Sequence, residues 1–397
     1  MYRPTFYSSL YIKRRKGVKI FIEPLDVLFF RDGRPFTAGE QHLAQSIFPP
    51  TSLTFQGAIR TNILKQTGIL TSPHRLKSFW QGTDEICDII GSSQDYGKLR
   101  IMGPFIAKKE GDNIVEYFVT PSDIVRTKES GKLHMLRPLK EGLFISDITQ
   151  DFKGIRPLWV RKKENLKRIP GYISKVDLER YLLDAISDIQ VVHEDSFLAR
   201  DPRLGITLQD GIKISREGLL YIAEFLKLKE KWGFTLDVHL ENGEGLEKYL
   251  PESGFFYLGG ERRAAFYFKI KEGNWLDLRE NIKEKVGKKK RFKLIFLTPA
   301  YSDQGWYATW MENGEKGEVK FKWVSACVRN FISIGGWNIA KRYPRPMGRF
   351  IPPGSVYYFE LEKGLDGLFK EFWLRPISEK YREIGFGLTL IGYWDYT

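Results

Sequence analysis

The chain has 397 residues, a hydrophobic fraction of 42% and a formal net charge of +14. This length predicts two domains, each with enough apolar residues to bury a core. The excess of 63 Lys and Arg over 49 Asp and Glu favours a polyanionic partner, most commonly nucleic acid. The apolar stretches are too short to span a bilayer, and two distant cysteines exclude a disulfide framework, so we expect a cytoplasmic protein with no membrane association.

The first elements are predicted from periodicity. Alternating apolar residues over 18–22 predict a strand with one buried face, and Pro24 interrupts it. Apolar residues four apart predict a helix over about 51–66. Short strand-like runs fill 101–160, and a helix is expected over 176–189. No parallel βαβ rhythm is present, so the first half is predicted to be α+β.

The second half is predicted to be richer in strands, with one amphipathic helix over 275–286. We interpret 219–228 and 234–240 as a hairpin. The other predicted strands cover 264–270, 292–298, 319–333, 355–361 and 388–393. The predicted domains are therefore 1–190 and 191–397, each compatible with a ferredoxin-like sheet.

Motifs for catalysis are absent. The chain has no P-loop, no HExxH motif and no clustered Cys/His spacing, and Leu258–Glu261 lacks the paired carboxylates that hold two metal ions. We expect no catalytic residue, no metal and no cofactor. One alternative stays open, because His42 follows the first strand and a metal-independent ribonuclease needs a histidine base near a phosphodiester.

Four segments combine arginine with glycine, proline or aromatic residues: Arg31–Phe36, Gly57–Arg60, Gly259–Arg263 and Gly335–Arg349. Glycine lets the backbone approach a phosphate, arginine binds phosphate through two donors, and aromatic rings stack on unpaired bases. These segments predict an RNA-binding site without a sequence-specific motif. The candidate residues are Arg31, Arg34, Arg60, Gly259, Gly260, Arg262, Arg263, Trp337, Lys341, Arg342, Arg345 and Arg349.

The same segments carry a family resemblance. Residues 22–36, then Phe48-Pro49-Pro50 and Gly57–Arg60, resemble the N-terminal signature of the third subunits of the type III-B CRISPR (Cmr) effector complex, in the RAMP superfamily. Further matching blocks follow in the expected order: Arg203–Ile206, Gly218–Tyr221, Leu258–Arg263, Gly335–Asn338, Pro352–Tyr357 and the glycine-rich Gly385–Gly392. The resemblance spans almost the whole chain from about residue 18.

The resemblance implies two ferredoxin-like (RRM-like) RAMP domains with insertions. It also implies a non-catalytic subunit that holds the repeat-derived 5′ tag of the CRISPR RNA (crRNA) in antiviral defence. Its expected partners are the large polymerase-like subunit and the backbone RAMP subunits, and it meets target RNA only indirectly. Two alternatives remain: a RAMP endoribonuclease that processes CRISPR transcripts through His42, and the equivalent subunit of the type III-A complex. The Arg31–Phe36 block favours type III-B.

Overall fold

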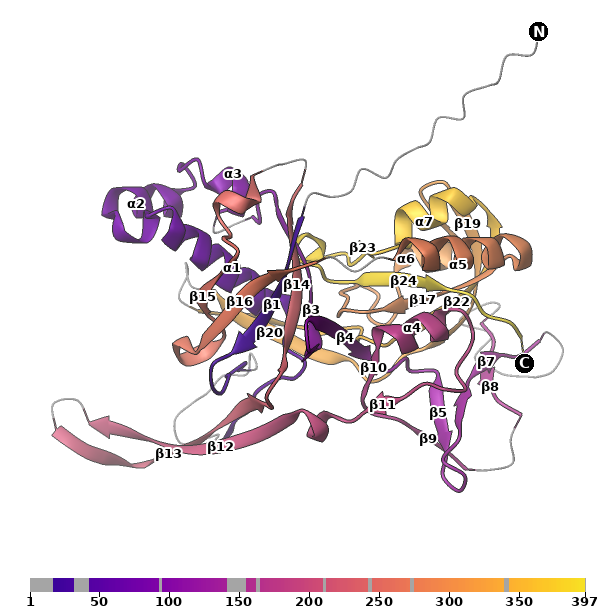
Figure 1. The fold of residues 1–397 in the computed structure, drawn as a ribbon, viewed down its shortest axis with the longest axis horizontal. Coiled ribbons are helices and arrows are strands. Elements are labelled where there is room, and N and C mark those ends of the chain that lie inside the picture. The colour runs from indigo at the N-terminus through magenta and orange to yellow at the C-terminus, as the bar shows by residue number, and fades with distance from the viewer. Residues whose placement is uncertain are drawn as a thin grey trace, which may run out of the picture.

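The computed structural model describes residues 17–31, 43–92, 95–140, 155–161, 165–209, 212–241, 245–271, 275–338 and 343–396. Two main sheets lie next to each other, and a long two-stranded hairpin extends away from them (Figure 1). Helices α1–α3 lie beside the first sheet, and α5–α7 lie beside the second (Figure 1). No helix in these described ranges is long and apolar enough to cross a membrane.

The first sheet is built around β1 (Gly17–Pro24), which pairs antiparallel with two strands more than 200 positions away. Residues Ile20 and Ile22 are buried in the same hydrophobic cluster as Phe55 and Ile59 of α1 (Ser52–Gln66). The strand order is β11-β10-β4-β3-β14-β1-β16-β15. Their bounds are β3 Leu99–Glu110, β4 Asn113–Val119, β10 Tyr172–Ser174, β11 Val191–Val192, β14 Trp232–Leu240, β15 Ser253–Tyr257 and β16 Ala264–Ile270.

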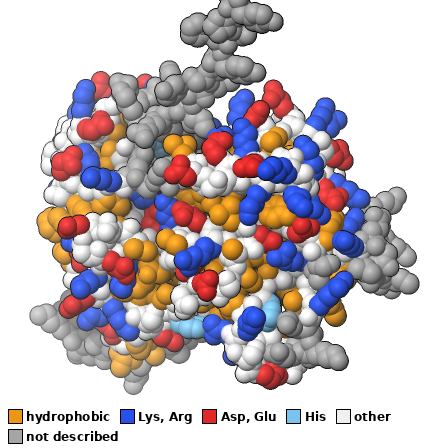
Figure 2. Space-filling model, turned by 45° about the vertical axis from the view of Figure 1, so that its right-hand side comes forward, with side chains coloured by type: hydrophobic (Ala, Val, Ile, Leu, Met, Phe, Trp, Pro, Cys, Tyr) orange, Lys and Arg blue, Asp and Glu red, His pale blue; other side chains and the backbone are white. Residues whose placement is uncertain are grey.

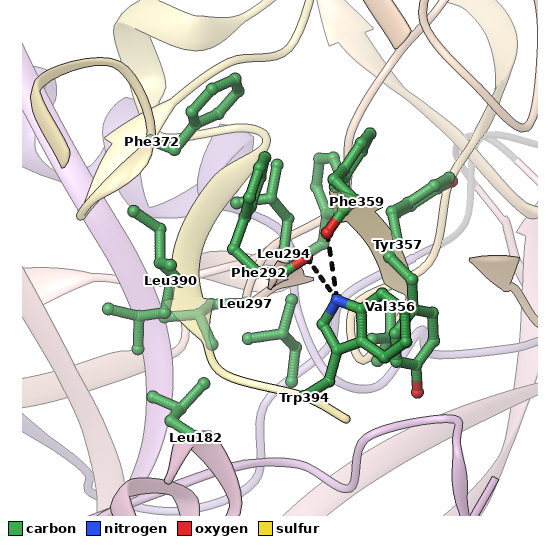
Figure 3. Close-up of a cluster of buried hydrophobic side chains, with 14 of the residues drawn as sticks. Leu182, Phe292, Leu294, Leu297, Val356, Tyr357, Phe359, Phe372, Leu390 and Trp394 are labelled. Carbon is green, nitrogen blue, oxygen red and sulfur yellow. Dashed lines mark hydrogen bonds between the residues drawn. The ribbon is translucent and has the colours of Figure 1, made fainter. Parts of the chain in front are cut away.

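The second sheet has the order β18-β19-β22-β17-β24-β23 and is antiparallel. Its core gathers aromatic and aliphatic side chains around Trp394, whose Nε1–H donates to the carbonyl oxygens of Phe292 and Phe359 (Figure 3). The strands are β17 Arg291–Phe296, β18 Glu315–Lys316, β19 Val319–Cys327, β22 Val356–Lys363, β23 Arg375–Pro376 and β24 Leu388–Gly392. Its helices are α5 Leu276–Lys289, α6 Thr309–Asn313 and α7 Leu365–Phe372.

Two further hairpins lie outside the two main sheets. The longer pairs β12 (Leu198–Gln209) with β13 (Ile212–Leu228), and β13 also pairs with the short β2 (Leu43–Ala44). The other pairs β20 (Ile332–Asn338) with β21 (Tyr343–Phe350). The remaining elements are α2 Pro73–Gln81, α3 Cys87–Ile90, α4 Lys175–Leu182, β5 Ile124–Thr127, β6 Leu133–Met135, β7 Arg137–Pro138, β8 Leu158–Trp159, β9 Leu166–Arg168 and the 3-10 turns η1 Ile69–Thr71, η3 Glu194–Ser196, η4 Leu246–Lys248, η5 Gly260–Arg262 and η6 Arg382–Ile384.

A buried polar cluster joins segments that belong to both halves. The carboxylate of Asp123, just before β5, accepts hydrogen bonds from the hydroxyls of Tyr181 on α4 and Tyr358 on β22. The Lys293 ammonium on β17 lies 3.6 Å from the centroid of the Tyr181 ring. All four side chains are fully buried. Buried polar groups are costly unless they are hydrogen-bonded, so this cluster fixes how the segment after β4 packs on the second sheet.

The mixed helix-and-sheet fold predicted from sequence is confirmed, as are the helices over 51–66 and 275–286. The predicted hairpin of 219–228 with 234–240 is wrong, because β13 pairs with β12 while β14 pairs with β1 and β3. The helix expected over 176–189 ends at Leu182. The expected division at 190/191 does not separate the sheets, because β14, β15 and β16 complete the sheet that β1 begins.

Candidate nucleic-acid interface

The Gly259–Arg263 loop packs directly on the segment that follows β1. The N–H of Gly260 donates a 2.7 Å hydrogen bond to the carbonyl oxygen of Phe29. A Cβ on Gly259 would lie 2.6 Å from that same oxygen, and Gly259 has a φ of +80°. Both glycines are therefore required by close packing on Phe29. The Gly259–Arg263 segment, predicted to bind RNA, is thereby joined to the residues that directly precede Arg31.

The base of the long hairpin joins this contact through Phe225 of β13. The guanidinium groups of Arg263 and Arg203 both lie over its ring, at 4.7 and 5.0 Å from the centroid. Each arginine also has a carboxylate partner, Glu261 for Arg263 and Asp201 for Arg203. Cation–π contact and ion pairing hold both side chains in place. The hairpin base was not among the residues predicted from sequence, because its link to the loop exists only in three dimensions.

Two predicted arginines near this contact are exposed. Arg262 is exposed and has a positive φ of 50°. Arg31 is also exposed and forms an isolated bridge with Ser46. We define Arg31, Gly259, Gly260, Arg262 and Arg263 as the loop group. The loop group combines exposed cations with a rigid glycine support, which suits contact with a phosphate backbone.

Arg60 has a different environment. Its guanidinium donates to the carbonyl oxygens of Gly91 and Ser92, at 3.0 and 2.6 Å, and so ties α1 to the loop after α3. Burial lowers the pKa of this guanidinium, and the neighbouring Tyr96 and Asp95 act in the opposite direction. Arg345 of β21 lies in the same neighbourhood and donates a long 3.4 Å hydrogen bond to the Tyr96 hydroxyl.

The β20–β21 hairpin presents exposed aromatic residues beside these arginines. Trp337 and Tyr343 are 57% and 46% exposed, and the hairpin register places them one pair apart, near the turn. Arg349 lies 4.7 Å from the ring centroid of the exposed Phe331. We define Arg345, Arg349, Trp337 and Tyr343 as the hairpin group. Exposed rings next to arginines are suited to stacking on unpaired bases.

A cavity of about 440 Å³ is lined in part by the first residues of β20. It is lined by the end of the Phe48–Ser52 segment, by Gly103-Pro104 of β3, by Pro352-Pro353 and by Ile332–Ile334 of β20. Its walls are mainly apolar, and Arg329 contributes a half-buried guanidinium that donates to the Ile169 carbonyl oxygen at 3.2 Å. An apolar cavity with a few polar groups is the usual form of a ligand site. Sequence reasoning missed it, although the proline pairs at two of its walls were a signal.

Some predicted residues cannot be placed. Arg34, Lys341, Arg342 and His42 lie outside the described residues. Within the described parts of the chain, no group of three or more His, Cys, Asp or Glu could hold a metal ion, and His193–Asp195 forms none. On the face drawn in Figure 2, Lys and Arg side chains alternate with acidic and apolar ones. On that face, then, positive charge is not gathered into one patch.

A family model described as CRISPR-associated protein (Cas_Cmr3) matches residues 20–394. The chain belongs to this family. The match covers nearly the whole sequence, so the resemblance drawn from residues 22–36 and the later glycine-rich blocks is confirmed for the Cas_Cmr3 protein as a whole. No curated protein sequence matches the chain.

Solved structures with a similar chain come from two related complexes. One is described as a type III-B Cmr-beta complex bound to cognate target RNA and AMPPnP, with 16% identity, a TM-score of 0.45 and coverage of 93% of this chain and 94% of that one. Another is a Csm3–Csm4 subcomplex of the type III-A interference complex, with 13% identity, a TM-score of 0.31 and coverage of 86% and 92%. These similarities add no residue roles to the Cas_Cmr3 chain.

Proposed function

We propose that this Cas_Cmr3 protein is a non-catalytic structural subunit of a type III-B CRISPR effector, which holds the 5′ tag of the crRNA. The observation that carries the proposal is the convergence of the loop group on Phe29 and on the base of the long hairpin. Three segments that are distant in sequence meet there: the residues around Phe29, the Gly259–Arg263 loop and the base of the long hairpin. The exposed arginines lie next to this packed contact. In the same proposal, the subunit joins the large polymerase-like subunit to the backbone RAMP subunits and meets target RNA only through them.

The strand orders support two ferredoxin-like units within this proposal. Strands β16-β1-β14-β3 and strands β24-β17-β22-β19 are both antiparallel, and each set runs in the spatial order fourth, first, third, second along its unit. That is the strand order expected of a βαββαβ unit. We assign the first unit to 17–270 and the second to 275–396. The segments between β4 and β14 are then insertions in the first unit.

RNA binding is tested with the purified full-length chain and a labelled RNA that carries the 5′ tag. The double variant Arg262→Ala/Arg349→Ala removes one exposed cation from each group, and Lys288→Ala/Lys289→Ala removes the same charge from the end of α5. We expect the first variant to bind more weakly and to lose more of its salt dependence than the second, because phosphate contacts release counterions. Equal binding by both variants would contradict the assignment of the site.

A cleavage experiment distinguishes the non-catalytic proposal from the alternative of an endoribonuclease. The wild-type chain is incubated with repeat RNA in the presence of a metal chelator, and the products are resolved on a denaturing gel. We expect intact RNA at all times. Cleavage that disappears in His42→Ala would replace the non-catalytic proposal with a histidine-dependent endoribonuclease.

A further inference from the structure

A second cavity, of about 330 Å³, lies in the second unit and contains none of the residues predicted to bind RNA. Its walls come from the end of β18, the C-terminal turn of α7, strand β23 and the 3-10 turn η6. The backbone after η6 packs tightly on the first sheet, since a Cβ on Gly385 would lie 2.5 Å from the carbonyl oxygen of Ile101 on β3. The cavity therefore borders the junction of the two units, near β23 in Figure 1.

The lining of this cavity is strongly cationic. Lys316, Lys370, Arg375 and Arg382 contribute four positive charges, and Glu371 contributes one negative charge, so the net charge is +3. Like charges gathered in one concave site repel one another and create a positive potential that attracts an anion. This arrangement costs stability when the cavity is empty of anions, and a bound anion offsets that cost.

The cations have few carboxylate partners of their own. Within the part of the chain that the structure describes, Lys316, Lys370 and Arg375 form no ion pair, and Arg382 has only a 3.5 Å contact with Glu383. Lys316 is half-buried, and burial lowers the pKa of its ammonium. The Nε–H of Arg375 donates to the Lys370 carbonyl oxygen at 3.2 Å, which fixes its guanidinium beside the cavity. The Lys316 ammonium lies 5.6 Å from the centroid of the Trp310 ring, and Lys370 and Arg382 are exposed.

The chemistry of the lining selects the ligand. Among the described residues, Pro376 and Ile377 supply the only apolar side chains of the lining, and none of the lining side chains is an aromatic ring on which a base could stack. Arginine binds a phosphate through two parallel donors, and lysine adds a point charge. We propose that this cavity binds a phosphodiester group of the RNA backbone, without reading its sequence. The inference rests on the proposed RNA-binding function and adds a contact in the second unit, apart from the loop and hairpin groups.

The test compares two double variants of the full-length chain, each of which loses two positive charges. Arg375→Ala/Arg382→Ala removes two exposed cavity cations, and Lys322→Ala/Lys363→Ala removes two exposed lysines of β19 and β22. Binding of a labelled single-stranded RNA is measured by fluorescence anisotropy over a series of salt concentrations. The RNA is used with a 5′ hydroxyl and with a 5′ phosphate. Thermal unfolding checks that both variants are folded, and Lys316→Ala provides a second cavity variant.

We expect the cavity variant to lower the slope of log K against log salt by about 0.7, and the affinity at low salt by about tenfold, because one single-strand phosphate contact contributes roughly 0.7 to the slope. The control variant should change both far less, and the two RNA ends should behave alike. A cavity variant that matches the control overturns this inference and leaves the proposed function intact. A loss confined to 5′-phosphorylated RNA, or displacement of RNA by millimolar inorganic phosphate, overturns it in favour of a terminal or free phosphate site. A wild-type chain that binds no RNA overturns both proposals.

Discussion

The N–H of Gly260 lies 2.7 Å from the carbonyl oxygen of Phe29, and this hydrogen bond links two segments that are more than 200 residues apart. The same carbonyl oxygen excludes any side chain at Gly259. In this family member the main role of the glycine pair is therefore structural: Gly259 and Gly260 allow the loop to pack on Phe29. Its effect on a ligand is indirect, because it sets where Arg262 and Arg263 are held.

Gly259→Ala is expected to destabilise the protein. The new Cβ would lie 2.6 Å from the Phe29 carbonyl oxygen at a φ of +80°, so the loop has to move. We expect a loss of about 1–3 kcal/mol in the free energy of unfolding, measured by urea denaturation. Gly57→Ala is the control, since nothing lies within 4 Å of its Cβ and it is inside α1, where alanine is favoured by about 1 kcal/mol. If the two variants are equally stable, close packing of Gly259 on Phe29 is not needed for the stability of the protein.

Arg60→Ala is expected to act on stability more than on RNA. Its guanidinium is engaged with the Gly91 and Ser92 carbonyl oxygens, so removing it leaves both without a donor. We expect a loss of about 1–3 kcal/mol in the free energy of unfolding. The exposed Lys65 of the same helix provides the matched control, Lys65→Ala, which should change stability little. The salt slope of RNA binding should be the same in both variants. A lower slope in Arg60→Ala with unchanged stability would restore Arg60 as a direct phosphate contact.

The fold was predictable where its signals are local. The helices over 51–66 and 275–286 have a helical apolar period within a single segment, and the strand expected at 18–22 is present. Its predicted single buried face is wrong, because Lys19 and Phe21 are buried as well as Ile20 and Ile22. The neighbours of β1 were not predictable, because Phe21 pairs with Thr235 and Phe268 across more than 200 residues. Alternation identifies a strand but does not select its partner. For this reason the sequence predicts that 219–228 pairs with 234–240, the next strand in the chain, whereas in the structure it pairs with β12.

The candidate site was predictable at the level of segments and not of side chains. Glycine next to arginine is the same pattern whether the glycine faces a phosphate or, as at Gly259, a carbonyl oxygen of the protein itself. Arg60 and Arg262 could not be distinguished from sequence, yet one is tied to backbone carbonyls and the other is exposed. The cationic cavity was missed because Lys316 and Arg375 are far apart in sequence and form no local cluster.

Trp337→Ala is expected to weaken RNA binding without changing its salt dependence. The indole is 57% exposed on the β20–β21 hairpin, and stacking on a base contributes about 1–3 kcal/mol without releasing counterions. Anisotropy titrations at several salt concentrations measure both quantities. Trp337→Phe should keep most of the affinity, and Trp80→Ala removes an exposed indole from α2 as a control. If the Trp80 and Trp337 variants bind equally well, stacking by the hairpin group is ruled out.

Asp123→Ala is expected to be the most destabilising single change. Its fully buried carboxylate accepts hydrogen bonds from Tyr181 and Tyr358, and burial together with this carboxylate raises the pKa of both phenols well above the usual value. Both hydroxyls therefore keep their protons and need an acceptor. Removing it leaves the buried Tyr181 hydroxyl without an acceptor, while Tyr358 keeps the Leu136 carbonyl oxygen. It also removes one of the two carboxylates, Asp123 and Asp184, that favour the charged form of Lys293, and we expect a loss of about 3–5 kcal/mol in the free energy of unfolding.

Two further variants show whether the loss of stability in Asp123→Ala comes from this cluster or from the loss of any carboxylate. Asp112→Ala, in the exposed turn between β3 and β4, should change the unfolding free energy by less than about 0.5 kcal/mol. Tyr358→Phe removes one donor and should cost about 1 kcal/mol, because Asp123 keeps its bond from Tyr181. If urea denaturation gives Asp123→Ala the stability of Asp112→Ala, the cluster does not hold the insertion after β4 on the second sheet.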